Sequence, residues 1–327
     1  MGEDGSMPDL AYRPLGNSGL IVSTIGLGCN NFGRPKTATA TQEGTTAVID
    51  AAIDAGVTLF DTADIYGGER GLSETLMGTS LKGKRDRIVL ATKFGMDMQG
   101  ANGPDWGARG SRRYIRIAVE ASLKRLQTDW IDLYQLHQSD GVTPMSETLE
   151  ALDELIAEGK VRYIGHSNLA GWQIVEAEYL AQLSQHQKFI SAQNEYSLVA
   201  RGVEAEVLPA VNAYGLGFLP FFPLFNGLFT GKYTRAGGPA DGRLSAIRPE
   251  ALDRVNWDAM EAYQAFCAGR GITMLEATIG WFLAQPGVTS IIAGATKPEQ
   301  VHQNVAAGGA WTPSAEDAAA ISGFFPV

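Results

Sequence analysis

Residues 130–167, with the sequence WIDLYQLHQSDGVTPMSETLEALDELIAEGKVRYIGHS, contain one complete structural unit of the chain. The apolar runs at 130–137 and 161–167 are rich in β-branched and aromatic residues, which predicts two strands. Between them, the apolar residues of 146–160 recur at intervals of three and four, and Gly159 suits the end of a helix. A strand, a helix and a second strand of this kind are typical of a parallel sheet with a crossover helix.

The same alternation continues on both sides of this unit. Six further strands are expected in apolar runs at 25–29, 57–67, 87–95, 189–197, 215–222 and 287–294. Two further helices are expected at 41–56, which ends at Gly56, and at 113–127. The resulting α/β pattern has eight nearly continuous apolar strands, so both faces of the sheet should be covered. Eight repeats favour closure into a (β/α)8 TIM barrel over an open doubly wound sheet.

An N-terminal hairpin is expected before the barrel. From Tyr12 to Cys29, two short extended runs flank the sequence GNSG at 16–19, which is turn chemistry, and such a hairpin could cap the barrel bottom. The opening segment is polar and small, so residues 1–9 are expected to be disordered, with Met7 as a possible natural start. Residues 10–327 should then form a single barrel domain.

Composition and charge narrow the classes of function. The chain has 327 residues with 45% hydrophobic content, which is enough to bury one enzyme-sized core. No apolar run approaches the ~18 residues of a membrane span, and no signal peptide is evident, so a cytoplasmic protein is expected. A net charge of −10 without runs of Lys or Arg argues against nucleic acid as the partner. The oligomeric state is not readable from the sequence.

The cysteines and histidines do not predict a metal site. Cys29 and Cys267 are too few for a disulfide framework or a zinc cluster, and the four histidines show no ligand spacing. His166 is expected to pack outward from the barrel, because adjacent residues of a strand point to opposite faces. A metal-dependent isomerase or hydrolase would need carboxylates or histidines converging on a metal, and the strand ends do not supply them.

Four polar residues stand at or just past the ends of predicted strands: Asp61, Tyr66, Lys93 and His137. In a parallel barrel, the carboxyl ends of the strands meet at one mouth, so these side chains should lie together. As a set they can deliver a proton to a carbonyl oxygen. Taken singly, each of them is more often a structural ion pair, a packed ring or a satisfied polar residue than a catalytic group. The ordered set is therefore what indicates catalysis.

The chain resembles the aldo-keto reductases from about Tyr12 to Phe325. The matching stretches are LGNSGLIVSTIGLGCNNFG, FDTADIYG, VLATKFG, DLYQLH, IGHSN, QNEYSL, PLFNGLFTGKY and GATKPEQVHQN. Members of this family are (β/α)8 barrels that transfer hydride between a nicotinamide cofactor, usually NADPH, and a carbonyl or alcohol. The resemblance therefore implies NADPH-dependent reduction of a small-molecule aldehyde or ketone.

The resemblance maps the family's catalytic residues onto the same four side chains. Tyr66 would be the general acid, and the ammonium of Lys93 would lower the pKa of the phenol by favouring the phenolate. Asp61 would pair with Lys93 and keep it oriented, so that loss of Asp61 weakens Tyr66 indirectly. His137 would donate a hydrogen bond to the substrate oxygen as a neutral imidazole.

The resemblance also implies a cofactor site, although no GxGxxG motif follows the first strand. Ser167, Asn168 and Gln193 would hold the carboxamide of the nicotinamide, and Phe221 would stack on its ring. The pyrophosphate would lie on the loop PLFNGLFTGKY, where glycines allow close approach of the backbone. The residues expected to bind there are Leu224, Gly227 and Lys232.

The segment GATKPEQVHQN, residues 294–304, would bind the adenosine end of the cofactor. It should begin a helix with Thr296 as the cap, and the free amides of such a helix start favour an anion. Lys297 would lie beside a 2′-phosphate, which favours NADPH over NADH. Gly294, Gln300 and Asn304 complete the cofactor residues that the resemblance implies.

The choice of substrate would depend on the loops 96–110, 138–144 and 233–249. Phe32, Trp106 and Gln138 are plausible walls of the substrate pocket. The alternative function is a cofactor-sensing regulatory subunit that works by binding a partner, as the potassium-channel β-subunits of this superfamily do. An intact catalytic set disfavours a purely structural role and leaves a dual role open.

Overall fold

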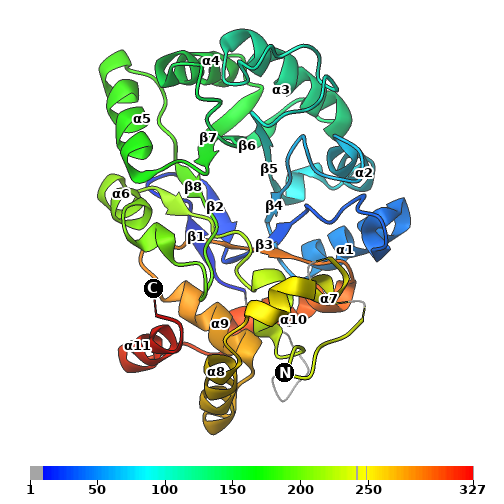
Figure 1. Cartoon of the computed structure of the whole chain (residues 1–327). Helices are drawn as coiled ribbons and strands as arrows, with labels where there is room; N and C mark the ends of the chain where they lie inside the picture. Colours follow the sequence, from blue (N-terminus) through cyan, green and yellow to red (C-terminus); the bar gives the residue numbers. More distant parts are fainter. Residues whose placement is uncertain (1–9, 241, 248, 327) are drawn as a thin grey trace.

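Eight parallel strands stand at the centre of the molecule, with helices around them (Figure 1). The structure is a computed structural model, and it describes residues 10–240, 242–247 and 249–326. The strands follow the order β10, β3, β4, β5, β6, β7, β8, β9, so that consecutive strands from β3 to β9 are neighbours. The prediction of disorder for residues 1–9 lies outside the described residues.

The two ends of this sheet meet, which closes the barrel. Parallel bridges join Phe218 to Val288 and Phe221 to Ile292, across the gap between the last two strands. The predicted (β/α)8 barrel is therefore confirmed. The strands are β3 (Ile25–Gly28), β4 (Leu59–Asp61), β5 (Val89–Phe94), β6 (Ile131–Leu136), β7 (Val161–Ser167), β8 (Ser191–Gln193), β9 (Gly217–Phe218) and β10 (Ile291–Gly294).

Helices follow the strands and cover the outside of the barrel (Figure 1). Gly56 and Gly159 each follow a helix end with φ of 82° and 77°, which is the left-handed conformation expected of a C-terminal glycine. The α-helices are α1 (Gln42–Asp54), α2 (Leu72–Ser80), α3 (Arg112–Leu126), α4 (Met145–Ala157), α5 (Gly171–Ser184), α6 (Val207–Tyr214), α7 (Arg243–Ile247), α8 (Trp257–Gly269), α9 (Met274–Leu283), α10 (Pro298–Ala310) and α11 (Ala315–Phe324). Short 3-10 helices are η1 (Ala38–Ala40), η2 (Arg85–Arg87), η3 (Gly202–Glu204), η4 (Phe225–Thr230) and η5 (Pro249–Arg254).

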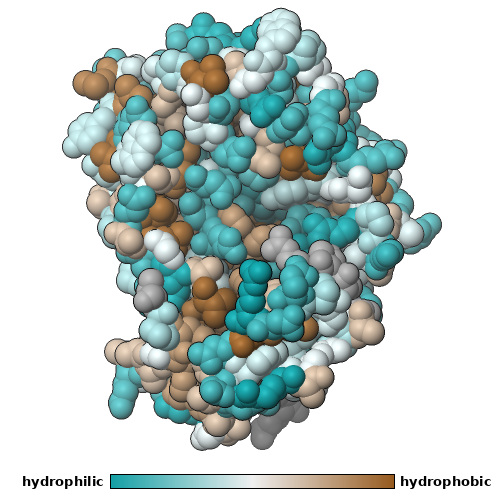
Figure 2. Space-filling view, viewed as in Figure 1, coloured by the Kyte–Doolittle hydropathy of each residue, from teal (hydrophilic) through white to brown (hydrophobic). Residues whose placement is uncertain are grey.

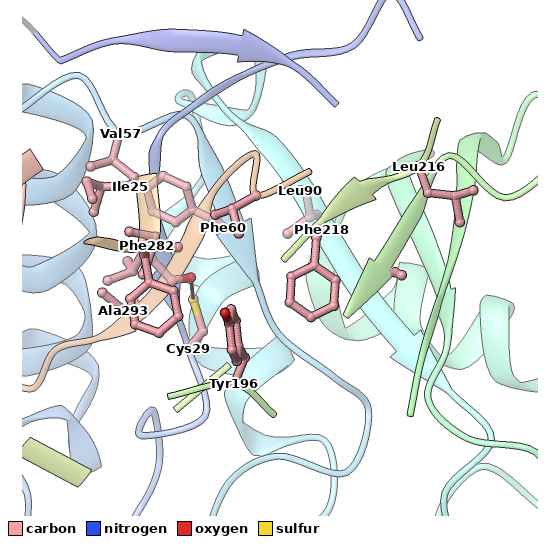
Figure 3. Packing of buried hydrophobic residues seen from close by; sticks show 14 of the residues in the cluster. Ile25, Cys29, Val57, Phe60, Leu90, Tyr196, Leu216, Phe218, Phe282 and Ala293 are labelled. Carbon is pink, nitrogen blue, oxygen red and sulfur yellow. Dashed lines mark hydrogen bonds between the residues drawn. The ribbon is translucent and has the colours of Figure 1, made fainter. Parts of the chain in front are cut away.

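Side chains along each strand alternate between the barrel interior and the surrounding helices. Near the amino ends of the strands, the interior holds an apolar layer: Leu59, Ala91, Leu133, Leu219 and Ile292. Two residues further along, the inward positions hold the polar residues Asp61, Lys93 and Gln135. The outward positions belong to the main core, where Figure 3 shows Phe60, Leu90 and Phe218 among other apolar side chains. The barrel is thus apolar at its bottom and polar at its mouth.

The N-terminal hairpin seals the apolar end of the barrel, as predicted. Strands β1 (Tyr12–Pro14) and β2 (Ile21–Ser23) pair antiparallel. Leu15 and Val22 are fully buried in the apolar layer of the barrel interior. Gly16 has φ of +57°, and a Cβ there would lie 2.6 Å from the backbone of Gly217. Only glycine therefore lets the hairpin turn pack this closely against the start of β9.

The C-terminal segment folds as a capped helix followed by an apolar end. The hydroxyl of Ser314 accepts from the N–H of Asp317 at the start of α11. Phe325 is 6% exposed, and its ring packs at 5.3 Å from Phe229 and 5.6 Å from Tyr263. Among the described residues, no helix combines the length and apolarity that crossing a bilayer would need.

His166 on β7 lies outside the barrel interior, between the strands and the helix layer. Its ring is fully buried at 5.2 Å from Phe189, and neither ring nitrogen has a hydrogen-bond partner among the described residues. Burial lowers the pKa of this imidazole to about 3. The residue is therefore a buried neutral side chain of the core.

Replacing His166 with leucine should make the fold less sensitive to acid. The folded-state pKa of about 3 lies below the ordinary value of 6.5, so at acid pH the unfolded chain binds a proton that the folded chain does not. Stability therefore falls as the pH drops below 6.5, by about 2 kcal/mol at pH 5. Urea unfolding at pH 8 and pH 5 measures this effect. The free energy of unfolding of the variant, relative to that of the wild type, should be about 2 kcal/mol higher at pH 5 than at pH 8. An equal difference at both pH values would contradict this account.

Candidate active site

Asp61 and Lys93 form a buried ion pair in the polar layer of the barrel. Asp61 ends β4 and Lys93 lies on the neighbouring strand β5; their exposed fractions are 2% and 0%. Nζ of Lys93 donates to Oδ2 of Asp61 at 2.6 Å and to the carbonyl of Thr62 at 2.9 Å. Burial lowers the pKa of Lys93, but Asp61 and Tyr66 outweigh it, so its pKa lies above the ordinary value. The lysine is therefore a fixed positive charge at neutral pH.

Two amides satisfy the other oxygen of Asp61. Gln135 and Gln193 donate to Oδ1 of Asp61 at 3.0 Å and 2.9 Å. Gln193 was expected at the carboxamide of a nicotinamide; here its side chain is 1% exposed and faces the buried carboxylate. Gln135 was not predicted as a site residue. Gln135 lies on β6, two residues before His137, so alternation along the strand puts it on the interior face. This spacing could have identified it.

Tyr66 lies in the loop after β4, with its hydroxyl 3.5 Å from Nζ of Lys93. Its N–H donates to Ala63 O and its carbonyl accepts from the N–H of Ser73, so the loop holds its backbone at both sides. Burial raises the pKa of Tyr66, and Lys93 lowers it by less, so the pKa lies above the ordinary value. The lowering that we expected from Lys93 is present, but the net shift has the opposite sign because the surrounding protein desolvates the phenol.

His137 follows β6 and faces Tyr66, with the ring centroids 5.8 Å apart and nearly perpendicular. Burial, and then the charge of Lys93, lowers the pKa of His137 to about 3. Its Nδ1 atom is buried without a hydrogen-bond partner among the described residues. The structure thus brings all four predicted catalytic residues together, with the imidazole neutral.

Two residues at the carboxyl end of β7 fix His137 and the neighbouring strand. Ser167 donates to the carbonyl of Gln193 at 2.7 Å, and the side chain of Asn168 donates to the carbonyl of His137 at 3.0 Å. Asn168 has φ of 57°, a left-handed conformation that is often found at functional sites. Phe221, which was expected to stack on a ring, is partly exposed beyond β9. All three residues lie at or beyond the carboxyl ends of β7 and β9.

The loop expected to hold a pyrophosphate has a strained backbone. After Leu224, the residues Phe225, Asn226 and Gly227 have φ values of 42°, 56° and 91°. Successive left-handed residues cost free energy and can turn backbone N–H groups toward an anion. A Cβ on Gly227 would lie 3.0 Å from Nζ of Lys232, so the lysine lies across this glycine.

The start of α10 differs in detail from the prediction. The residue before the helix is Lys297, and Thr296 does not cap it. Pro298 takes the first helical position, and the Gln300 side chain reaches back to accept from the backbone and hydroxyl of Thr296, at 2.8 Å and 3.2 Å. Lys297 is exposed there, Asn304 is 8% exposed, and Gly294 lies close to the side chain of Asn31.

The three expected substrate walls are placed differently from one another. Phe32 is fully buried in the main core, so its ring does not line an open surface. Trp106 is 77% exposed and stacks on the guanidinium of Arg113 at 4.1 Å. Gln138 is partly exposed directly after His137. Viewed as in Figure 1, the surface has a recess near the centre with hydrophilic residues around it (Figure 2).

The arrangement of these four side chains is suited to proton transfer. A phenol lies beside a buried ammonium, the ammonium is held by a carboxylate, and a neutral imidazole faces the phenol. Such a set can protonate a carbonyl oxygen and stabilise the charge that develops on it. Within the described part of the chain, His, Cys, Asp and Glu do not gather in threes that could hold a metal ion.

Comparison with known proteins agrees with this geometry. The model of the Aldo/keto reductase family matches residues 24–324. The uncharacterized oxidoreductase YrpG of Bacillus subtilis is 37% identical over 305 residues, covering 91% of each chain. A probable voltage-gated potassium channel subunit beta of Oryza sativa is 33% identical, over 91% of each chain. The L-glyceraldehyde 3-phosphate reductase of Escherichia coli K12 is 32% identical, over 91% of this chain and 87% of its own. The chain therefore belongs to the aldo/keto reductase family.

Proposed function

We propose that this protein reduces an aldehyde or ketone to the alcohol with NADPH, and that Tyr66 is the general acid. One observation carries the proposal: the fully buried ammonium of Lys93 contacts Asp61 on one side and the hydroxyl of Tyr66 on the other. A buried charge of this kind is costly unless it is paired, and here the pair sits at the only phenol of the catalytic set.

The residues present fit a dinucleotide cofactor. Phe221 offers a partly exposed ring, and the left-handed run at 225–227 offers backbone donors for a pyrophosphate. Lys297 precedes the first turn of α10, and the positive end of a helix dipole favours an anion such as a 2′-phosphate. When bound, the nicotinamide supplies the hydride.

The protein's own residues then donate the proton and bind the substrate oxygen. Tyr66 gives its proton to the carbonyl oxygen as negative charge develops there, and the ammonium of Lys93 stabilises the phenolate that remains. His137 donates a hydrogen bond to the same oxygen, and it stays neutral because its pKa is about 3. Asp61 holds the ammonium in place, itself held by Gln135 and Gln193.

Titration with NADPH and NADH, followed by turnover with a panel of aldehydes, tests the proposal. Quenching of tryptophan fluorescence reports binding, and the loss of absorbance of the reduced cofactor reports turnover. Binding with turnover is the expected result. A lack of NADPH binding would contradict the cofactor assignment.

Lys297→Ala should weaken NADPH far more than NADH. A charge-assisted contact with the 2′-phosphate should be worth about tenfold or more in Kd, and NADH lacks that phosphate. Fluorescence titration of both cofactors measures this ratio. Lys82→Ala, an exposed lysine after α2, is the control and should leave both affinities unchanged. Equal weakening of both cofactors by Lys297→Ala would place the phosphate elsewhere.

A regulatory role is the second candidate, because one relative is named as a potassium channel subunit beta. In that role the protein would bind the cofactor and a partner, with little turnover. The aldehyde panel separates the two functions: tight NADPH binding without reduction of any aldehyde would favour the regulatory one.

A further inference from the structure

A second set of buried polar side chains lies on the outer side of the barrel wall, next to α2 and α3. Asp64 and Glu74 are fully buried, and Asn102 is 8% exposed. Thr92 precedes Lys93 on β5, and alternation along the strand points its side chain away from the barrel interior. None of these groups takes part in the proton transfer proposed above. The set is completed by Arg125 and by the phenols of Tyr114 and Tyr134, which interact electrostatically with Asp64.

The hydrogen bonds of this set form one continuous chain. Asn102 donates to Oδ2 of Asp64 at 3.0 Å, and its own oxygen accepts from Nη1 of Arg125 at 2.8 Å. Nε of Arg125 donates to Glu74 at 2.7 Å. The hydroxyl of Thr92 donates to the other oxygen of Glu74 at 2.6 Å. Asn102 is thus the link between Asp64 and the ion pair.

This chain of hydrogen bonds joins two segments that are far apart in sequence. Asp64 lies between Asp61 and Tyr66, and its backbone N–H donates to the carbonyl of Lys93 at 3.2 Å. Asn102 belongs to the loop 96–110, whose tip carries the exposed Trp106. The segment with Tyr66 is therefore held on one side by β5 and on the other by the loop that was expected to select the substrate.

We infer that Asn102 is a positioning residue, which couples the loop 96–110 to the segment that carries Tyr66. The inference rests on the proposed function for the identity of the substrate that the loop would enclose. Loss of Asn102 frees both segments, so that substrate enclosure and placement of the phenol fail together.

The charges around Asn102 explain why a neutral amide fits there. Arg125 donates to Glu74 and to the amide oxygen of Asn102, while Asp64 accepts from the amide nitrogen of Asn102. Oδ1 of Asp64 is buried without a hydrogen-bond partner among the described residues. Burial and then Glu74 raise the pKa of Asp64 well above its usual range, more than Arg125 and Asn102 lower it. A third carboxylate at position 102 would add to this excess of acid.

Hydrogen–deuterium exchange of the full chain tests the coupling without any turnover. In Asn102→Ala, peptides that cover 62–67 and 96–110 should both exchange about tenfold faster than in the wild type. Asn102→Leu keeps a similar size but removes both the donor to Asp64 and the acceptor for Arg125, so it should loosen the same two segments. Faster exchange of the loop alone, or of neither segment, would overturn the proposal.

Asn256→Ala is a matched control for a general loss of stability. The side chain of Asn256 caps α8 by accepting from the N–H of Ala259 at 3.2 Å. Its removal costs about as much stability as a lost helix cap usually does. Exchange at 62–67 and 96–110 should remain as in the wild type, which a merely global effect would not predict.

Steady-state kinetics of the same variants separates the two proposals. Asn102→Ala should lower kcat/KM about tenfold more for an aryl aldehyde than for a small aliphatic one, with the Kd of NADPH within about twofold of the wild type. An equal loss for both aldehydes together with weaker NADPH binding would contradict positioning by Asn102. A wild type that reduces no aldehyde would contradict the proposed function, while the exchange result would still decide the coupling.

Discussion

Tyr66→Phe should lower kcat for aldehyde reduction by ~10³-fold and leave the Kd of NADPH within about twofold. The ring and its packing remain, and only the hydroxyl 3.5 Å from Lys93 is lost. Steady-state kinetics and fluorescence titration measure the two quantities separately. The effect on kcat should be large because no other side chain of the catalytic set can replace the proton donor: His137 is neutral with a pKa of about 3, and Lys93 is held by Asp61.

Tyr179→Phe is the control for this substitution. Tyr179 lies on α5 and is 55% exposed, so loss of its hydroxyl should change neither kcat nor cofactor affinity. If Tyr66→Phe kept near-normal kcat, the general acid would have to be another group. If it lost NADPH binding instead, Tyr66 would be a cofactor residue.

Lys93→Met is expected to cost both activity and stability. Removing the ammonium leaves Asp61 as a buried carboxylate without its ion partner, which destabilises a fold by about 3–5 kcal/mol. The phenolate of Tyr66 also loses its counter-charge, so kcat falls with it. Urea unfolding and aldehyde reduction measure the two losses on the same preparation.

The double variant Asp61→Asn with Lys93→Met separates the two losses. An amide at position 61 can still accept from Gln135 and Gln193, and it leaves no unpaired charge. Most of the stability should return, while reduction stays lost. A double variant with restored activity would show that the ion pair is structural only.

The clustering of the proposed catalytic residues could be predicted because it depends on a regular pattern. Strands of a parallel barrel end at the same mouth, so the positions of Asp61, Lys93 and His137 at strand ends implied their proximity. The same alternation also contained Gln135, which was missed because it lies inside an apolar run and not at its end.

Features that depend on burial or on irregular loops could not be predicted. The net pKa shift of Tyr66 follows from the desolvation of its phenol, which no local pattern reports. Phe32 and Trp106 lie in segments without periodicity, and the structure buries the first and exposes the second. Thr296 fails as a cap because Pro298 starts the helix one residue later than expected. The hydrogen bond from Asn102 to Asp64 joins residues 38 apart in the sequence, so only the folded structure reveals it.

Transfer of deuterium from NADPH to product tests most directly whether the protein reduces a carbonyl at this site. NADPH labelled at C4 on one face or the other is incubated with the wild type and an aldehyde that it turns over, and the alcohol is analysed by mass spectrometry. Only one of the two labels should appear on the carbinol carbon, because the proposed site would fix both the ring and the carbonyl. Alcohol without deuterium from either label, or no alcohol with any aldehyde despite NADPH binding, would contradict direct reduction by this site.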